Sequence, residues 1–478
     1  MNSELALLVD IGSTYTKMIS VDIGRNLVVG RSAAPSTVGR GVQHGLLEAL
    51  RRLTGEPVSS LKEGLSPFGH LFASSSAAGG LRMVVIGLVA SLTVEAGRRT
   101  ALGAGAKVIG GFGDKLGPQE ISRIEELSPD IILLAGGTDG GDRDTILHNA
   151  MAVALSKICC PVVASGNREC AGEVAHILQS GRKEVRTAEN VMPDLLKLNP
   201  VSAGKEIRDV FFERITEAKG LEVVKQWFPV IMPTPMAVLQ GASILSQGTS
   251  DAPGLGELIV LDVGGATTDV HSIAWGKPKH GGVVMEGLEE PFAKRTVEGD
   301  LGIRCNASTI VGHMGLPAVQ EELGCFAGDS GPSSEAELLH HVNLLSRDTT
   351  RLPETPWERE VDFALASVCL RIALNRHAGR MIGEIHSSMA MKPFLIQRGK
   401  DLREVPHLIG TGGIFSYQER AADLLRRSLQ NQGDGVLSPV SPALHLDSGY
   451  LLWAAGLLQE AAPGTAFAIA RESLRRVE

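Results

Sequence analysis

A short pattern occurs twice in this chain, and the repeat restricts the fold more than any other feature of the sequence. One apolar strand leads into Asp10, and a second leads into Asp262. When the two aspartates are aligned, the turn Asp10–Lys17 falls in register with Asp262–Asp269, and an aspartate, a glycine and a threonine coincide. A strand and polar turn that recur in register predict two homologous half-domains facing each other.

The chemistry of these turns suits a nucleoside triphosphate. Glycine lets backbone N–H groups approach phosphate oxygens closely, and hydroxyl side chains offer further donors. Carboxylates suit hydrated Mg²⁺, which keeps several waters and needs few protein ligands. We therefore expect ATP and Mg²⁺ as cofactors, with Asp10 and Asp262 at the metal and Lys17 neutralising phosphate charge. The predicted phosphate-binding residues are Gly12, Ser13, Thr14, Thr16, Lys17, Gly264, Gly265, Ala266, Thr267 and Thr268.

A third glycine loop, formed by Gly410, Thr411, Gly412 and Gly413, follows a short apolar strand. Such a loop suits a segment that passes flat beneath adenine or ribose. A single Asp-x-Gly turn would be interpreted as a tight turn after a strand and nothing more. Two turns in register, with a third glycine loop downstream, favour a nucleotide site instead.

The stretch between residues 70 and 195 has a different texture, because apolar runs alternate with helical stretches. This alternation predicts a parallel sheet with covering helices, which is a Rossmann-like insert. The stretch 326–360 is polar and is predicted to be rich in loops. The expected domains are 1–69, the N-terminal part of the first half; 70–195, the insert; 196–250, the return to the first half with a connecting helix; 251–440, the second half with the nucleotide clasp; and 441–478, a C-terminal connecting helix and tail.

The composition excludes several classes of protein. The formal net charge is −8, and no basic face indicates a nucleic-acid partner. The 6 cysteines form no paired CxxC sets, so neither a zinc site nor a disulfide framework is expected. The longest apolar run, roughly 83–92, is too short to span a bilayer, and the N-terminus does not resemble a signal peptide. We therefore expect a cytoplasmic protein without a membrane partner.

With these motifs in order, the chain resembles the superfamily of actin, hexokinase and the heat-shock ATPases. The turns at Asp10 and Asp262 are similar to its two phosphate motifs, and Gly410–Gly413 is similar to its adenosine motif. Thr234–Gly241 and Asp447–Gly456 resemble its two connecting helices. The resemblance implies an α/β fold in which duplicated actin-like (ribonuclease H-like) ATPase halves carry a Rossmann-like α/β insert.

Within that superfamily, Leu134–Gly141 and Thr296–Arg304 resemble the glutamate mutase accessory proteins often called MutL-type, which are unrelated to the mismatch-repair protein of that name. The resemblance covers nearly the whole chain. It implies a reactivating factor whose partners are the subunits of an adenosylcobalamin-dependent mutase, such as glutamate mutase or an amino-acid aminomutase. ATP binding and hydrolysis would open the mutase, so that damaged cobalamin leaves and intact cofactor enters.

The catalytic residues follow from the same resemblance. In the heat-shock ATPases a glutamate opens the first connecting helix and helps to order the attacking water, whereas here the matching position falls near Thr234 and no acid stands nearby. The expected catalytic residues are therefore Asp10, Asp262 and Asp269, which order water through Mg²⁺. We expect this arrangement to give slow hydrolysis.

Two further polar segments keep more than one interpretation. The loop Thr138–Asp142 either caps a helix or forms a docking or cofactor-sensing surface. Glu298, Asp300 and Arg304 either reach the γ-phosphate, position water, or form a structural ion pair. The layout of the insert resembles cobalamin-binding domains, but the chain lacks the Asp-x-His-x-x-Gly motif that supplies a histidine to cobalt, so direct cobalt ligation is not expected.

Two other functions use the same clasp. A small-molecule kinase needs a substrate pocket with a base near the γ-phosphate, and the sequence assigns none. A subunit of an ATP-dependent hydrolase resembling hydantoinases would need a partner subunit. A reactivating chaperone is the interpretation that the motifs favour over both.

Overall fold

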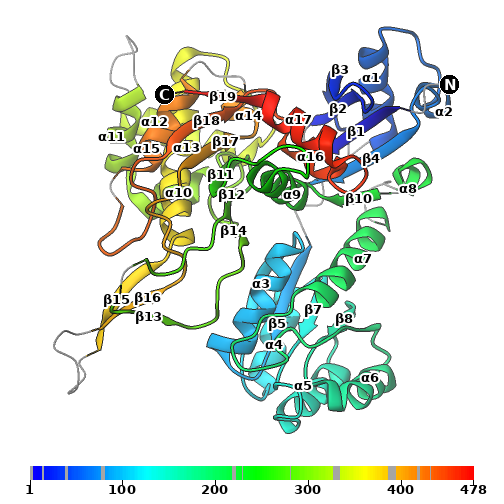
Figure 1. The fold of residues 1–478 in the computed structure, drawn as a ribbon, viewed down its shortest axis with the longest axis vertical. Coiled ribbons are helices and arrows are strands. Elements are labelled where there is room, and N and C mark those ends of the chain that lie inside the picture. Colours follow the sequence, from blue (N-terminus) through cyan, green and yellow to red (C-terminus); the bar gives the residue numbers. More distant parts are fainter. Residues whose placement is uncertain are drawn as a thin grey trace. The chain divides into compact units, whose positions relative to one another are not determined.

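Backbone contacts in the computed structural model divide the chain into two compact units (Figure 1). Unit 1 comprises Met1–Ala237 with Gly287–Glu289, and unit 2 comprises Val238–Glu286 with Glu290–Glu478. The structure describes residues 4–12, 15–37, 41–76, 81–217, 222–228, 230–279, 281–326, 334–385, 394–416, 420–430 and 432–477. The finer division into five segments stays a proposal.

Unit 1 contains a sheet whose strands follow the order β10-β4-β1-β2-β3. β1, β2 and β3 form an antiparallel meander, and β4 and β10 extend it in parallel with β1. β1 is buried almost throughout because its residues are nearly all apolar, as the core strand of such a sheet requires. The strands are β1 (Leu5–Ile11), β2 (Tyr15–Asp22), β3 (Leu27–Pro35), β4 (His70–Ser75) and β10 (Val230–Pro233).

Unit 2 repeats this arrangement in a sheet of order β14-β12-β11-β17-β18-β19. β11, β12 and β14 form an antiparallel meander, and β17 and β18 extend it in parallel with β11. β19 adds an antiparallel edge. The strands are β11 (Leu258–Val263), β12 (Thr268–Ile273), β14 (Ala293–Glu298), β17 (His407–Thr411), β18 (Ala443–Asp447) and β19 (Leu474–Arg476).

The two sheets match in register as well as in strand order. Asp10 pairs with Lys17 across β1 and β2, and Asp262 pairs with Asp269 across β11 and β12. The alignment of the two turns is thus reproduced in the backbone. The expected fold class, α/β with duplicated actin-like (ribonuclease H-like) halves, is confirmed.

The insert in unit 1 is an all-parallel sheet of order β6-β5-β7-β8-β9, which is the order of a flavodoxin-like doubly wound sheet. β7 is entirely buried and entirely apolar, as expected of a parallel strand covered on both faces. The expected Rossmann-like insert is therefore present. Its elements are β5 (Arg82–Ile86), η1 (Ala90–Val94), α3 (Glu95–Gly103), β6 (Lys107–Phe112), α4 (Pro118–Leu127), β7 (Ile131–Leu134), α5 (Asp144–Leu155), β8 (Val162–Ala164), η2 (Arg168–Cys170), α6 (Ala171–Ser180) and β9 (Val185–Thr187).

In each half, one helix follows the last parallel strand. α9 (Thr234–Gln247) begins directly after β10, and α16 (Leu452–Leu458) begins shortly after β18. Within unit 2 they pack closely, because a Cβ atom at Gly241 would lie 1.9 Å from the carbonyl oxygen of Leu452. The remaining helices are α1 (Val42–Thr54), α2 (Leu61–Leu65), α7 (Val201–Glu217), α8 (Glu222–Trp227), α10 (Ala307–Met314), α11 (Leu316–Phe326), α12 (Glu335–Arg347), α13 (Pro356–His377), α14 (Gly413–Ser416), α15 (Ala421–Ser428) and α17 (Pro463–Ser473).

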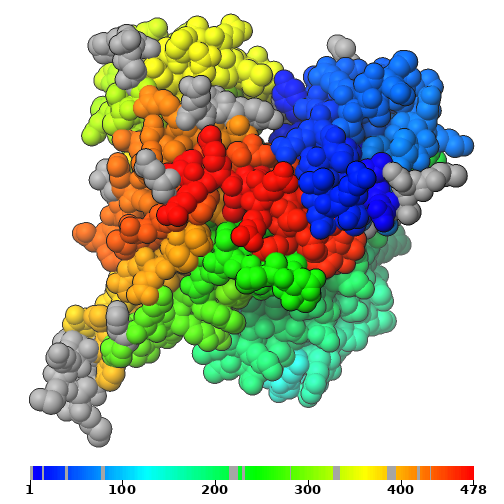
Figure 2. Space-filling model, turned by 45° about the horizontal axis from the view of Figure 1, so that its top comes forward, coloured from blue at the N-terminus to red at the C-terminus, as the bar shows by residue number. Residues whose placement is uncertain are grey.

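Unit 2 departs from the sequence-based expectation in one stretch and adds one sheet. The polar stretch 326–360 was expected to be rich in loops, but it contains α12, whose N-cap Ser334 accepts a hydrogen bond from Glu337 N. A small sheet of order β13-β16-β15 projects from the rest of unit 2 (Figure 1, Figure 2). Its strands are β13 (Val283–Glu286), β15 (Arg380–Ile385) and β16 (Phe394–Arg398).

Candidate nucleotide site

The first turn, in unit 1, places Asp10 at the carboxyl end of β1. The side chain is 2% exposed, and its Oδ1 accepts hydrogen bonds from Thr234 Oγ1 at 2.7 Å and Ser74 Oγ at 3.1 Å. Thr234 is the first residue of α9, so the position that lacks the expected acid instead supplies a hydroxyl to Asp10. The predicted residues Ser13 and Thr14 lie outside the described residues.

The backbone of the two turns is held in the same way. Gly12 N donates to Tyr15 O at 3.0 Å, and Gly264 N donates to Thr267 O at 2.8 Å. A Cβ atom at Gly12 would lie 2.7 Å from the carbonyl oxygen of Tyr15, so a side chain there requires the turn to open. At Gly264 a Cβ atom would lie 3.4 Å from the carbonyl oxygen of Thr267, so the closure requires glycine in the first turn but not in the second.

In unit 2, the second turn and the third glycine loop lie together. Asp262 is half-buried at the end of β11, and a Cβ atom at Gly412 would lie only 2.5 Å from its Oδ1. Gly412 also has φ of +97°, a conformation that L side chains rarely adopt. Both constraints require glycine. Gly413 is exposed, and a Cβ atom at Gly410 would lie 2.5 Å from Phe415.

A loop after β14, residues 299–306, holds the carbonyl oxygens of the second turn; we call it the brace. Gly264 O accepts from Ile303 N at 3.2 Å, and Gly265 O accepts from Arg304 N and Cys305 N, both at 2.9 Å. Asn306 Nδ2 donates to Ala266 O at 2.9 Å. Gly302 is required here, because a Cβ atom would lie 2.3 Å from the backbone of Ala266.

The brace fixes the direction of the N–H groups in the turn. No peptide bond in the described residues is cis. A trans peptide group points its N–H away from its C=O, so the N–H groups of Gly265, Ala266 and Thr267 point away from the brace. Gly265 and Ala266 are exposed. Successive backbone N–H groups that converge on solvent form a nest for an anion.

The hydroxyls of the repeated threonines have partners within the fold. Thr16 is fully buried, and its Oγ1 shares a hydrogen bond of 3.0 Å with Ser36 Oγ. Thr268 is fully buried too, and its Oγ1 donates to Leu301 O at 2.6 Å. These contacts favour a structural role for both hydroxyls.

Asp269 lies in a buried ion pair. Arg295 contacts its Oδ1 through Nη2 at 2.6 Å and Nε at 2.8 Å, and Thr267 Oγ1 donates to its Oδ2 at 3.3 Å. The carboxylate therefore holds Thr267 in the turn, which favours a positioning role over the ordering of water.

The open question about Glu298, Asp300 and Arg304 has a structural answer for the last of them. Arg304 forms a bidentate ion pair with Asp362 of α13, at 2.7 Å and 2.6 Å. Asp300 contacts Arg376 at 3.1 Å and His313 at 3.0 Å, and Glu298 contacts Arg376 at 2.6 Å. Burial raises the pKa of Asp362, and the charge of Arg304 offsets only part of that effect.

Sequence reasoning named Asp447 as the start of a connecting motif but missed its role, which is to organise the end of the second half. It is fully buried, and its Oδ2 accepts hydrogen bonds from Thr411 Oγ1 at 2.7 Å and Leu452 N at 3.1 Å. Its Oδ1 accepts from Leu451 N at 2.9 Å. An aspartate at the end of an apolar strand, just before a helix, was the signal. The hydroxyl of Thr411, predicted to contact nucleotide, thus holds this carboxylate.

The insert's glycine-rich loop is held by two buried asparagines. Asn167 Oδ1 accepts from Gly140 N at 3.1 Å, and Asn190 Nδ2 donates to Gly137 O at 3.0 Å. Asp142 Oδ1 accepts from Thr145 N at 3.1 Å at the start of α5. This contact supports the helix-capping interpretation of Asp142.

Clusters of metal ligands and membrane-spanning helices are both absent from the residues that the structure describes. These residues contain no group of three or more His, Cys, Asp or Glu side chains arranged to hold a metal ion. Hydrated Mg²⁺ needs few protein ligands, so the carboxylates of Asp10 and Asp262 suit it as hard oxygen donors. Over the same residues, no helix has the length and apolar character needed to cross a membrane.

The fold and the site together define a class: an α/β protein with duplicated ribonuclease H-like halves, a Rossmann-like insert and, in unit 2, a glycine turn whose carbonyl oxygens are held by the brace. A family model described as MutL protein matches residues 6–474. The "Protein MutL" of Clostridium tetanomorphum is 40% identical over 477 residues, which cover 98% of this chain and 99% of that protein. The chain therefore belongs to the MutL protein family.

Two solved structures are distantly similar to this chain. A glycerol dehydratase reactivase is 13% identical with a TM-score of 0.32, over 95% of this chain and 99% of that one. The ethanolamine utilization protein EutJ from Carboxydothermus hydrogenoformans is 11% identical with a TM-score of 0.27, over 98% of this chain and 90% of that one. TM-scores this low carry no argument, and the fold rests on the two matching sheets of the chain itself.

Proposed function

We propose that this chain is an ATP-dependent reactivating chaperone that exchanges damaged cobalamin on an adenosylcobalamin-dependent mutase of the glutamate mutase or aminomutase type. Membership of the MutL family supports an accessory role beside a mutase. The nucleotide part of the proposal rests on one observation above all. The carbonyl oxygens of Gly264, Gly265 and Ala266 are all held by the brace, and the N–H groups behind them are left to face an anion.

The residues divide into those that contact phosphate and those that hold them. The N–H groups of Gly265, Ala266 and Thr267 bind phosphate oxygens, and Lys17 neutralises their charge. Asp269, Thr268 and the brace keep the turn in place. In the proposal, Ser13 and Thr14 supply further donors from the first turn, and Gly412 and Gly413 leave room for the nucleoside beside Asp262.

Asp10 and Asp262 are the proposed ligands of Mg²⁺, which would neutralise the charge of the phosphates when bound. Asp10 is held in a fixed orientation by Thr234 and Ser74, which both donate to Oδ1, so its Oδ2 has a defined direction. Thr234 is a hydroxyl and not a general base, which supports slow ATP hydrolysis. Slow turnover suits a protein that uses ATP to change its state, because ATP shifts an equilibrium only when it binds one state better.

The nucleotide site is tested by Asp262→Ala with Asp434→Ala, an exposed aspartate of the same unit, as the control. We expect ATP·Mg²⁺ affinity, measured by titration calorimetry, to fall at least about tenfold in the first variant and to stay unchanged in the second. Circular dichroism checks that both variants are folded. Equal affinities in the two variants would remove Asp262 from the site.

The chaperone role is tested with a mutase loaded with an inactive cobalamin. The purified chain is added with ATP, Mg²⁺ and fresh adenosylcobalamin, and released cobalamin and recovered mutase activity are measured. We expect recovery only when ATP is present, and none with Asp262→Ala. A nucleotide-dependent pull-down from native lysate identifies the mutase. Recovery without ATP would refute the proposed ATP dependence. Phosphorylation of a small metabolite by the chain alone, without recovery of the mutase, would favour the kinase.

A further inference from the structure

Three residues of unit 1 are supplied from within the sequence of unit 2. The chain leaves unit 2 after Glu286, contributes Gly287–Glu289 to unit 1, and re-enters unit 2 at Glu290. Leu288 is only 2% exposed and is part of the hydrophobic core of unit 1. We call Gly287–Glu289 the anchor.

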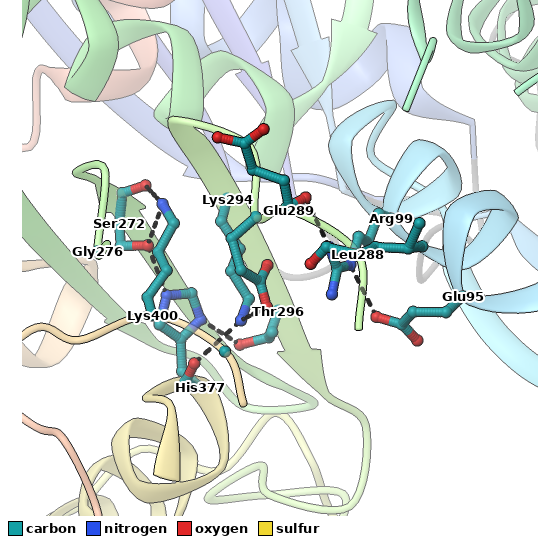
Figure 3. Close-up of polar contacts among 12 residues, drawn as sticks. Glu95, Arg99, Ser272, Gly276, Leu288, Glu289, Lys294, Thr296, His377 and Lys400 are labelled. Carbon is teal, nitrogen blue, oxygen red and sulfur yellow. Dashed lines mark hydrogen bonds and ion pairs between the residues drawn. The ribbon is translucent and has the colours of Figure 1, made fainter. Parts of the chain in front are cut away.

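Arg99 of α3 holds this anchor by its backbone (Figure 3). Its Nη1 donates to Leu288 O at 3.0 Å and to Glu289 O at 2.8 Å. Its Nε contacts Glu95 Oε1 at 2.9 Å, one turn earlier on the same helix, and the Arg99 side chain is 12% exposed. A guanidinium that is held by a carboxylate and donates to two successive carbonyls fixes the path of the chain as well as its position.

The residues that follow the anchor are held equally firmly, but by unit 2. Lys294 Nζ contacts Glu290 Oε1 and the carbonyl oxygen of His377, both at 3.1 Å. Thr296 Oγ1 shares a hydrogen bond of 2.8 Å with His377 Nδ1 (Figure 3). Arg295, between them, forms the ion pair with Asp269 of the second turn. β14 is thus fixed to α13 and to the turn at once.

The end of β14 runs directly into the brace. One continuous stretch, residues 287–306, therefore begins in the core of unit 1 and ends on the carbonyl oxygens of the proposed phosphate turn. Along the way only a few residues separate the anchor at Leu288 from Arg295, whose partner is Asp269. β14 covers Ala293–Glu298, and residues 290–292, which form no helix or strand, join it to the anchor. The link between the turn and the anchor is therefore short.

We propose that residues 287–306 couple nucleotide binding at the second turn to the conformation of the insert, with Arg99 as the positioning residue that holds the link. An anion on the N–H side of the turn polarises its peptide groups and strengthens the hydrogen bonds that their carbonyl oxygens accept from the brace. The brace then tightens, and β14 transmits the change to α3 through the anchor. The inference rests on the proposed binding of ATP to this turn.

The alternative is that the anchor only fills the core of unit 1 with Leu288. That alternative predicts that loss of Arg99 lowers stability but leaves the response to ATP intact. Coupling predicts the reverse pattern: the turn still binds ATP, and the insert no longer responds. The two ideas therefore differ in the response of the insert to ATP, which a change in stability alone does not alter.

The test is amide hydrogen exchange of the full chain with and without ATP·Mg²⁺, comparing Arg99→Ala with Arg123→Ala. Arg123 lies on α4 of the same insert in an exposed ion pair with Glu126, so its removal controls for lost charge. In the unaltered chain and in Arg123→Ala, we expect ATP to slow exchange in α3 about fivefold or more. In Arg99→Ala, we expect protection at residues 262–269 to persist and the change in α3 to vanish.

Each other outcome has a meaning. ATP binding without any change in α3 of the unaltered chain overturns the coupling alone, whereas absence of ATP binding overturns the proposed function with it. A response of α3 that survives in Arg99→Ala also overturns the coupling. If Arg99→Ala does not fold, Leu288→Ala is the second variant. It removes most of the buried side chain of the anchor without altering charge, and the same loss of the α3 response is expected.

Discussion

The ion pair between Arg304 and Asp362 gives a quantitative test of how the brace is held. Its two contacts are 2.7 Å and 2.6 Å long, and the side chains are only 10% and 9% exposed. In Asp362→Ala the guanidinium stays buried, with only the carbonyl oxygens of Ile303 and Arg351 as partners. Removing one member of a buried pair costs about 3 to 5 kcal/mol, because the other charge is left uncompensated.

Burial decides this magnitude, and the chain offers a matched control. Asp423 and Arg426 are 2.9 Å apart, but their side chains are 36% and 39% exposed. Exposed pairs are worth about 0 to 1 kcal/mol, because water screens the charges and two long side chains lose freedom. Asp423→Ala should therefore change the free energy of unfolding several-fold less than Asp362→Ala, although the contact distances are similar.

A double variant separates the charge from the packing. Burial raises the pKa of Asp362 although Arg304 lowers it, so the pair is formed at a cost of desolvation. Replacing both residues by apolar ones, as in Arg304→Met with Asp362→Leu, should therefore restore stability to within about 1 kcal/mol of the unaltered chain. The donors to Gly265 O are backbone N–H groups, so they remain in the double variant.

The assay is urea unfolding at pH 7, followed by tryptophan fluorescence. Three of the 4 tryptophans, Trp275, Trp357 and Trp453, lie in unit 2, and Trp357 shares α13 with Asp362, so most of the signal reports on that unit. A shift of the midpoint without a change in slope measures stability. If Asp362→Ala costs less than about 1 kcal/mol, or if the double variant is as unstable as the single one, then the pair does not support the brace in the way described.

Three further predictions follow from single positions. Gly412→Ala forces a side chain onto φ of +97° and against Asp262, so ATP affinity measured by calorimetry should fall at least about tenfold. Gly464→Ala is the control, because a Cβ atom at Gly464 meets nothing within 4 Å, and it should leave the affinity unchanged. Thr234→Val removes a hydroxyl from a buried carboxylate and should cost about 1.5 to 3 kcal/mol in urea unfolding, while Thr234→Ser should recover most of this. Burial lowers the pKa of His271 from 6.5 to about 3, so the unfolded chain takes up the proton first and stability is lost as the pH falls below 6.5. His271→Leu should remove roughly 1 to 2 kcal/mol of the stability that is lost between pH 6.5 and 5. An unchanged pH profile of the free energy of unfolding would contradict this.

The sequence predicted the parts of the fold that are encoded locally. The repeated strand and turn were found because an apolar run, an aspartate and a glycine lie next to one another in the chain, and the paired register reproduces them. α12 was missed because charged residues surround it. The helix nevertheless has buried residues at helical spacing, namely Leu338, His341, Val342 and Leu345. The sequence therefore carried a helical pattern, but only on one narrow face.

The residues that hold the site were harder to predict, because their partners come from distant parts of the chain. Asp362 is 58 residues from Arg304, and nothing near either one marks the pairing. Gly302 was a better signal. It lies between Asp300 and Arg304 in a segment noted for its pattern, and its lack of a side chain is required by contact with Ala266.

The repeated threonine shows how a duplicated pattern can carry a structural meaning in both copies. Its position after each turn suggested a phosphate ligand in both halves. In unit 1 the hydroxyl of Thr16 contacts Ser36, directly after β3, and in unit 2 the hydroxyl of Thr268 contacts Leu301, shortly after β14. β3 and β14 are the third strands of equivalent meanders, so each threonine ties its turn to the segment that leaves the third strand. Retention of this residue is explained by the geometry of the turn alone. The case for phosphate binding therefore rests on the backbone N–H groups that the brace directs outward.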